Sequence, residues 1–115
     1  MEIQLFGAAR TVTGSCYSIT VGDKKILVDF GMFQGGKEMS RKNYYPFGFD
    51  PKDYTAVLLT HAHLDHCGRI PKLVKEGFQG TVYATKPTQD LAEVVMLDSF
   101  LQALNAKIAI INSIA

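Results

Sequence analysis

The order of its predicted elements indicates that this chain forms a single α/β or α+β domain of layered sheets and helices. Two observations predict this class. The first thirty residues have the pattern of an antiparallel β-meander, and the segment after them has the pattern of a β-α-β-α series. The length of 115 residues suits one domain. A compact chain of this size buries roughly two thirds of its unfolded surface, which is enough for a core.

The N-terminal strands are predicted from alternation and turn chemistry. Segment 2–7 (EIQLFG) alternates and is rich in residues that favour strands, and segment 15–21 (SCYSITV) has the same pattern. Gly22 and Asp23 then provide the residues of a hairpin turn. Segment 24–31 (KKILVDFG) returns as the third strand and stops at its glycine.

The second half is predicted to alternate between strands and helices. Segment 54–60 (YTAVLLT) is a continuous apolar run, which suits a strand buried on both faces. Segment 70–78 has helical spacing, with a proline in its first turn and Gly77 at its C-terminal cap. Segment 80–85 (GTVYAT) is another strand.

A second helix is predicted over residues 87–104 (PTQDLAEVVMLDSFLQAL), with Thr88 as its N-cap. Its apolar face is expected to comprise Leu91, Val94, Val95, Leu101 and Leu104.

Composition excludes few functions, but it indicates the expected redox state of the cysteines and the expected cellular compartment. The chain is 47% hydrophobic and 20% charged with a formal charge of +1, so no global field points to a nucleic-acid or membrane partner, although a local patch could suffice. Two cysteines are too few for a disulfide framework, which favours reduced thiols. No signal peptide and no apolar run of about 20 residues is visible, so we expect a cytoplasmic protein without a membrane span.

Residues 32–52 show no clear period, and long irregular loops of this kind are usually functional or disordered. Four aromatic side chains make disorder the less favoured option: Tyr44, Tyr45, Phe47 and Phe49. Basic residues precede them, and basic and aromatic side chains together can bind single-stranded nucleic acid. We favour a simpler interpretation, in which the aromatic side chains fix the loop to the core.

The stretch THAHLDHCGRI (60–70) contains every histidine of the chain, His61, His63 and His66, together with Asp65. It lies at the C-terminal end of a predicted buried strand, where α/β sheets place ligands. Neutral imidazole and carboxylate are donors that Zn²⁺, Fe and Mn²⁺ accept. Four donors within six residues cannot close on one ion without strain, so two neighbouring ions fit better. Packing gives no reason to gather these groups on one turn.

HAHLDH resembles the signature of the metallo-β-lactamase superfamily, whose fold is an αββα sandwich with a two-metal site. The surrounding motifs resemble the β-CASP nucleases, in the branch that contains the mRNA 3′-end cleavage subunit and its bacterial and archaeal relatives. The resemblance covers about residues 3–99 and rests on five motifs in order: GAARTVTGSC, LVDFGMFQGG, LLTHAHLDHCGRIPKLVKEGF, GTVYAT and PTQDLAEVVMLDS. It implies the N-terminal half of a metallo-β-lactamase domain.

The resemblance also assigns roles to single residues. It implies that His61 and His63 bind a first zinc ion and that Asp65 and His66 bind a second. Asp65 would also orient the attacking water. Asp29 matches an acid at the end of a strand and is expected to hold a ligand by a hydrogen bond.

Three residues of the resemblance, Asp98, Cys67 and Asp29, have alternative interpretations. Asp98 matches an acid of the family, so a supporting role and a boundary position facing water are both open. Cys67 adjoins the ligands, but its position varies in the family, so we predict a packing role. The alternative for Asp29 is a turn residue at a strand end.

The resemblance implies a metal-dependent phosphodiesterase that processes single-stranded RNA, using a metal-bound hydroxide that attacks phosphorus in line with the leaving oxygen. One alternative is a thiolester or lactam hydrolase of the same superfamily. Another is a non-catalytic metal-binding or interaction module.

The later ligands of the family and its inserted β-CASP domain fall outside the matched region, and no histidine follows His66. The tail 100–115 departs from the long polar helix expected there. We therefore predict at most one weakly held metal ion and no catalysis by the chain alone. Half a sandwich would leave a sheet face and edge strands unpaired, so we expect self-association or a complementary second half.

Overall fold

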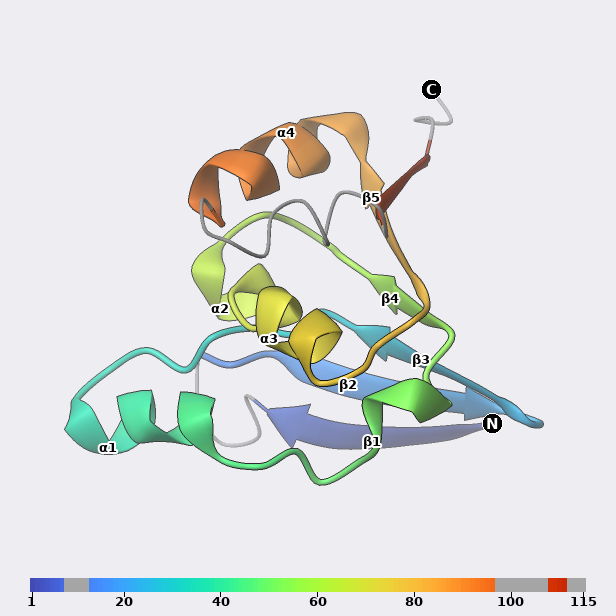
Figure 1. Ribbon diagram of the computed structural model, residues 1–115, viewed down its shortest axis with the longest axis horizontal. Helices are drawn as coiled ribbons and strands as arrows, with labels where there is room; N and C mark the ends of the chain where they lie inside the picture. Colours follow the sequence, from blue (N-terminus) through green and yellow to red (C-terminus); the bar gives the residue numbers. More distant parts are fainter. Residues whose placement is uncertain (8–12, 97–107, 112–115) are drawn as a thin grey trace.

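A computed structural model describes residues 1–7, 13–96 and the backbone of 108–111. One six-stranded sheet forms its frame, with its strands in sequence order. The strands are β1 (Glu2–Gly7), β2 (Cys16–Val21), β3 (Lys24–Val28), β4 (Ala56–Leu58), β5 (Thr81–Thr85) and β6 (Ile108–Ile111). β1, β2 and β3 pair antiparallel, and every later pair is parallel (Figure 1). The predicted mixed α/β class is confirmed.

The predicted antiparallel meander and its turn are confirmed, and the structure adds the register of the strands. Gly22 follows β2 with φ of 61°, the left-handed conformation that glycine adopts without steric cost. β1 and β2 pair Ile3 with Ile19 and Leu5 with Tyr17, so apolar side chains meet across the strands.

The helices are short except for the last. They are α1 (Lys37–Arg41), α2 (Leu64–Cys67), α3 (Ile70–Lys75) and α4 (Lys86–Val95), with 3₁₀ turns η1 (Lys42–Tyr44) and η2 (Pro51–Asp53). α3 has its proline in the first turn, as predicted. Gly77 lies just beyond its end at φ of 119°, and Phe78 N then donates to Leu73 O at 3.0 Å, as a C-terminal cap requires.

The core lies between α3 and one face of the sheet. Leu27, Val57 and Val82 from β3, β4 and β5 share one cluster with apolar side chains of the α3 region. The aromatic side chains of the long loop join it: Phe47 lies 5.1 Å from Phe30 between ring centroids, at an edge-to-face angle of 85°. The prediction that aromatic residues fix this loop to the core is confirmed for Phe47 and Phe49, while the two tyrosines of the loop are exposed.

Two predictions about α4, its N-cap and its apolar face, are wrong. The N-cap of α4 is Thr85, and Thr88 lies inside the helix, where it is buried and accepts a hydrogen bond from Thr85 Oγ1 at 3.0 Å. The expected apolar face is exposed at Leu91 (59%) and Val94 (65%), because this helix buries the smaller side chains of Thr88 and Ala92. Leu101 and Leu104 lie outside the described residues.

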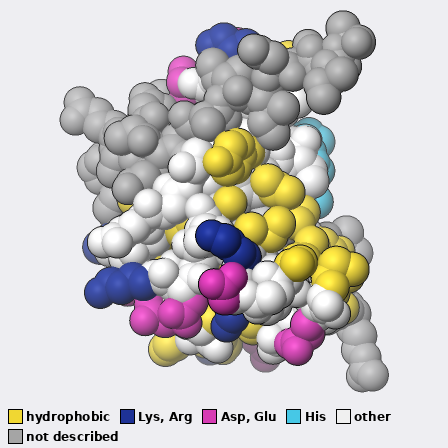
Figure 2. All heavy atoms as spheres, turned by 90° about the vertical axis from the view of Figure 1, so that its right-hand side faces the viewer, with side chains coloured by type: hydrophobic (Ala, Val, Ile, Leu, Met, Phe, Trp, Pro, Cys, Tyr) yellow, Lys and Arg dark blue, Asp and Glu magenta, His cyan; other side chains and the backbone are white. Residues whose placement is uncertain are grey.

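β4 is also covered on one face only, because Leu58 remains 37% exposed. It belongs to a wider surface that we call the outer face. The strand registers align Tyr17, Val28, Leu58 and Tyr83 across four strands, so their side chains point to the same side. Exposed apolar side chains of the outer face are Ile3, Leu5, Tyr17, Val21, Leu58 and Tyr83. Seen from the side in Figure 2, hydrophobic side chains form a continuous run close to histidine side chains.

None of the helices in the described ranges has the length and apolar character needed to cross a membrane.

Candidate metal centre

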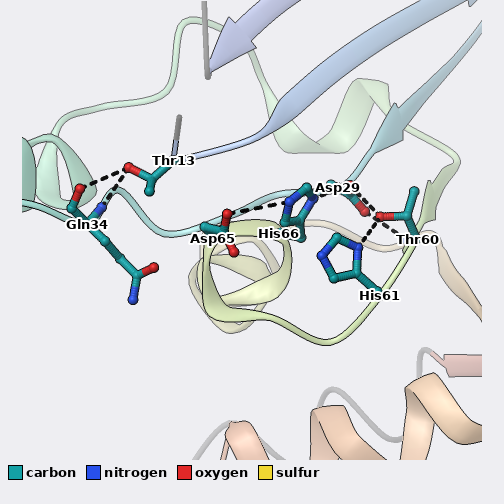
Figure 3. A network of polar contacts seen from close by, with 7 residues as sticks. All are labelled: Thr13, Asp29, Gln34, Thr60, His61, Asp65 and His66. Carbon is teal, nitrogen blue, oxygen red and sulfur yellow. Dashed lines mark hydrogen bonds and ion pairs between the residues drawn. The ribbon is translucent and has the colours of Figure 1, made fainter. Parts of the chain in front are cut away.

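The candidate site gathers where β3 and β4 end and α2 begins (Figure 3). Asp29 directly follows β3, and His61 lies three residues after the end of β4. His63 is the N-cap of α2, and Asp65 and His66 lie within that helix. The structure therefore brings together the four predicted ligands and Asp29. Asp98 lies outside the described residues.

Backbone hydrogen bonds fix α2 against the chain that leaves β3. Phe30 N donates to His66 O at 2.9 Å, and Met32 N donates to Leu64 O at 2.8 Å. The contact is so close at Gly31 that a Cβ there would lie 1.6 Å from Asp65 O. A glycine is required at this position, because any larger residue would push the helix that carries two predicted ligands.

Asp29 is the centre of the polar network. Its carboxylate is buried and accepts hydrogen bonds from Thr60 N (2.8 Å), Thr60 Oγ1 (2.8 Å) and His66 Nδ1 (2.7 Å). Its φ is 62°, the only positive value at a non-glycine residue among those described. Such a backbone conformation costs free energy, and it persists only where contacts with the surrounding structure hold it. Residues of this kind are common at functional sites.

These hydrogen bonds fix the tautomers of two histidines. Because Asp29 only accepts, His66 Nδ1 must donate, which leaves the lone pair of His66 Nε2 free. Thr60 Oγ1 gives its proton to Asp29, so it accepts from His61 Nδ1 at 3.0 Å. The lone pair of His61 Nε2 is then free as well. Both imidazoles are held in the form that binds a metal through Nε2.

The distances suit a shared metal ion. His66 Nε2 lies 3.5 Å from Asp65 Oδ2. Two ligands of a tetrahedral Zn²⁺ ion, each bonded at 2.0–2.2 Å, lie about 3.4 Å apart. Ring centroids of His61 lie 3.9 Å from His66 and 4.8 Å from His63, so the three imidazoles adjoin one another.

The donor atoms suit zinc, but in the arrangement that the structure describes these side chains form only part of a metal site. Within residues 1–7 and 13–96, no group of three or more histidine, cysteine, aspartate and glutamate side chains is arranged to hold a metal ion. The Asp65–His66 pair has the separation expected for two ligands of one ion, and its role as ligands stays a prediction. Other ligands would have to come from water, from a rotated side chain or from further chain.

The two cysteines lie in the core. Cys67, the residue between the ligands and Gly68, is fully buried, and burial raises the pKa of its thiol to about 11. This geometry supports the packing role predicted for it. Burial likewise raises the pKa of the Cys16 thiol from 9.0 to about 12.

We predict that neither thiol reacts with a disulfide reagent at pH 8 while the chain is folded, because reaction needs an accessible thiolate. Colorimetric titration should count no thiol in buffer and two in denaturant. The raised pKa of Cys16 also gives stability that is complete below pH 9 and is lost as the pH rises toward 12. Rapid labelling of the folded protein would contradict the burial of both residues.

Sequence reasoning missed two residues that shape the site. Thr60 was assigned to a strand, yet its hydroxyl joins Asp29 to His61. Its position beside the first histidine was the available signal, because a neighbouring hydroxyl can orient an imidazole. Gly31 gave no signal of its own, since the clash with Asp65 O arises between segments 34 residues apart in sequence.

Comparison with known proteins agrees with the fold. The sequence profile of the metallo-β-lactamase superfamily matches residues 9–103, and the chain belongs to this superfamily. A ribonuclease of Thermus thermophilus is 57% identical over 99 residues, which cover 86% of this chain and 22% of that protein. The transcription termination factor FttA of Methanocaldococcus jannaschii is 37% identical over 98 residues, covering 85% of this chain and 16% of the factor.

Among solved structures, a subclass B3 metallo-β-lactamase of Bradyrhizobium japonicum aligns with a TM-score of 0.51 and 32% identity, over 70% of this chain and 30% of that one. The fold is therefore part of a metallo-β-lactamase fold. The resemblance to the RNA-processing branch is confirmed by the relatives. The chain spans about a fifth of the length of the curated relatives it matches.

Proposed function

We propose that this chain forms part of a metal-dependent phosphodiesterase that acts on single-stranded RNA. The observation that carries the proposal is the network in which Asp29 and Thr60 hold two imidazoles with their Nε2 atoms free. Its strongest support from comparison is the similarity to a ribonuclease. A bound divalent ion would supply Lewis acidity and an activated water for attack on a phosphodiester.

The residues of the chain then have separate tasks. His61 and His63 would hold one metal ion, and Asp65 and His66 would hold another. The Asp65 carboxylate would also accept a hydrogen bond from the attacking water and so orient it. Asp29 is a positioning residue, because it acts through His66 and Thr60 and touches no reacting atom. The backbone contacts of α2 keep Asp65 and His66 in register with the end of β3.

We predict that the isolated chain binds at most one zinc ion, weakly, and that His63→Ala lowers the affinity about tenfold or more, because a direct ligand is lost. Isothermal titration calorimetry with ZnCl₂ measures both. His63 is exposed, so the variant should keep its fold by circular dichroism. The control is Asp90→Asn, which removes an exposed carboxylate of α4 whose partner is Lys86. Equal zinc binding by the wild type and His63→Ala would count against the site.

The reaction class needs a separate test. Because the chain alone is expected not to catalyse, this test measures binding. The zinc-loaded chain is titrated with labelled single-stranded RNA and with a lactam. Zinc-dependent RNA binding that is weakened in His63→Ala supports the proposal. Lactam binding without RNA binding would replace it with a hydrolase of another branch. If the chain binds neither zinc nor RNA, it acts as a non-catalytic interaction module.

We also propose that the outer face is covered by a second copy when the chain is alone, or by a complementary segment otherwise. Its apolar side chains lie on neighbouring strands, and Leu5 and Val21 are 53% and 56% exposed. Contiguous apolar surfaces of this kind mark interaction sites.

Leu5→Lys should therefore shift the chain toward the monomer, because it places a charge in the centre of a buried contact. Sedimentation velocity over a range of protein concentrations measures the shift. Leu91→Lys is the matched control, since Leu91 is equally exposed (59%) but lies on α4. A wild-type chain that stays monomeric at all concentrations would exclude the self-association.

A further inference from the structure

Arg69 is a buried cation without a counter-ion. Its side chain is 8% exposed, and its Nη2 atom is buried without a hydrogen-bond partner. Its Nε donates to the carbonyl of Gly31. In the described part of the chain, ion pairs join other residues, and none joins Arg69 to a carboxylate.

Two aromatic rings hold the guanidinium in place. Its Cζ lies 4.2 Å from the centroid of Phe30 and 4.6 Å from that of Phe33. Cation–π contacts offset part of the cost of burying the charge, but buried charges are normally paired as well. Burial also lowers the pKa of Arg69. The guanidinium therefore retains a donor suited to an anion.

Arg69 lines a cavity of about 320 Å³, and the histidines are not among the residues that line it. Lys42 is the second cation on its wall, with its Nζ 5.6 Å from the centroid of the same Phe33 ring. Phe47, Phe49 and Tyr45 supply flat apolar surface to the same cavity. The cavity thus combines two positive charges with aromatic faces, and none of the described residues that line it is acidic.

The walls of the cavity are fixed before any ligand arrives. The Asn43 side chain accepts from Phe33 N at 2.6 Å and donates to Phe33 O at 2.8 Å. Lys72 Nζ donates to the carbonyls of Asn43 (2.9 Å) and Tyr45 (3.2 Å). These bonds tie the aromatic loop to α3, so little conformational entropy is lost on binding.

We propose that this cavity binds a nucleoside monophosphate unit, with the phosphate between Arg69 and Lys42 and the base against the aromatic rings. Arginine and lysine bind phosphate oxygens, and aromatic side chains stack on bases of any sequence. The volume lies at the lower end of the range for small-molecule sites, so it suits one nucleotide. The unit could be a free nucleotide or one residue of a strand. The proposal is independent of the metal centre.

The test is calorimetric titration of the full chain with AMP, adenosine and an adenylate hexaribonucleotide without terminal phosphates. EDTA is present, so that metal at the histidines cannot hold phosphate. We expect AMP to bind at least tenfold more tightly than adenosine, because adenosine lacks the anion. Tighter binding of AMP than of the hexamer identifies a free nucleotide as the ligand, and the reverse identifies a strand. Either order supports the site.

Lys42→Gln should weaken AMP binding about tenfold, whereas Lys24→Gln, at the exposed start of β3, should leave it unchanged. Arg69→Met should abolish binding if the variant folds. If it does not fold, Lys42→Gln and the adenosine comparison decide. Equal affinity for adenosine and AMP, an unchanged affinity in Lys42→Gln, or no binding of AMP or the hexamer at about 10 mM would overturn the proposal.

Discussion

Asp29→Asn is expected to lower the zinc affinity of the chain about 10- to 100-fold while the fold is retained. Asparagine tolerates the left-handed conformation at φ of 62°, so the backbone need not move. Its side-chain oxygen can still accept from Thr60 N. Its NH₂ group then faces His66 Nδ1 and Thr60 Oγ1, where the wild-type oxygen accepts two hydrogen bonds.

The consequence is a change of tautomer. His66 Nδ1 must accept a hydrogen bond from the new NH₂ group, so the proton of the neutral imidazole moves to Nε2. A protonated Nε2 has no lone pair for a metal ion. Flipping the amide would instead place two donors, the NH₂ group and Thr60 N, against each other. Either arrangement lowers the free energy of unfolding by about 1–2 kcal/mol. This cost is small compared with the effect that losing a ligand has on zinc binding.

Calorimetry with ZnCl₂ measures the affinity, and nitrogen chemical shifts of the His66 ring report the tautomer directly. Asp23→Asn, in the exposed turn between β2 and β3, is the matched control and should bind zinc as the wild type does. Asp29→Ala should unfold at lower denaturant, because it leaves Thr60 N without its acceptor. Normal zinc affinity in Asp29→Asn, with the Nδ1–H tautomer retained, would remove Asp29 from its positioning role.

Gly31→Ala is expected to destabilise the chain by about 3 kcal/mol or more and to abolish zinc binding. The added Cβ would lie 1.6 Å from Asp65 O and 2.1 Å from Asp65 C, which are backbone atoms that no rotamer change can move. Relief requires α2 to shift by more than an ångström. That shift breaks the hydrogen bonds of Phe30 N and Met32 N to α2 and displaces Asp65 and His66 from the end of β3.

Urea unfolding followed by circular dichroism measures the stability, and zinc titration below the transition measures the site. Gly36→Ala is the matched control, because a Cβ there meets nothing within 4 Å and its φ is −64°. Its free energy of unfolding should stay within about 0.5 kcal/mol of the wild type. If Gly31→Ala unfolds like this control, then α2 and the end of β3 are not in the close contact described.

Much of the fold could be predicted from local sequence. Alternation and the Gly22–Asp23 turn predicted the antiparallel pairs, since a two-residue hairpin fixes its own register. A proline in the first turn and Gly77 after the last turn bounded α3, because both residues act on the adjacent backbone. The burial of α4 was mispredicted, because a helical stripe of apolar residues does not say which side will meet the sheet.

The sequence by itself determined which donors the candidate site has, because the three histidines and Asp65 lie within one short turn and must stay near each other. Only the tertiary structure decided which ring nitrogens are free, since Asp29 and Thr60 follow different strands and lie 31 residues apart. The same holds for Gly31, for the outer face and for the unpaired guanidinium of Arg69. Each depends on contacts between distant segments, and no local pattern records a distance between segments that only folding brings together.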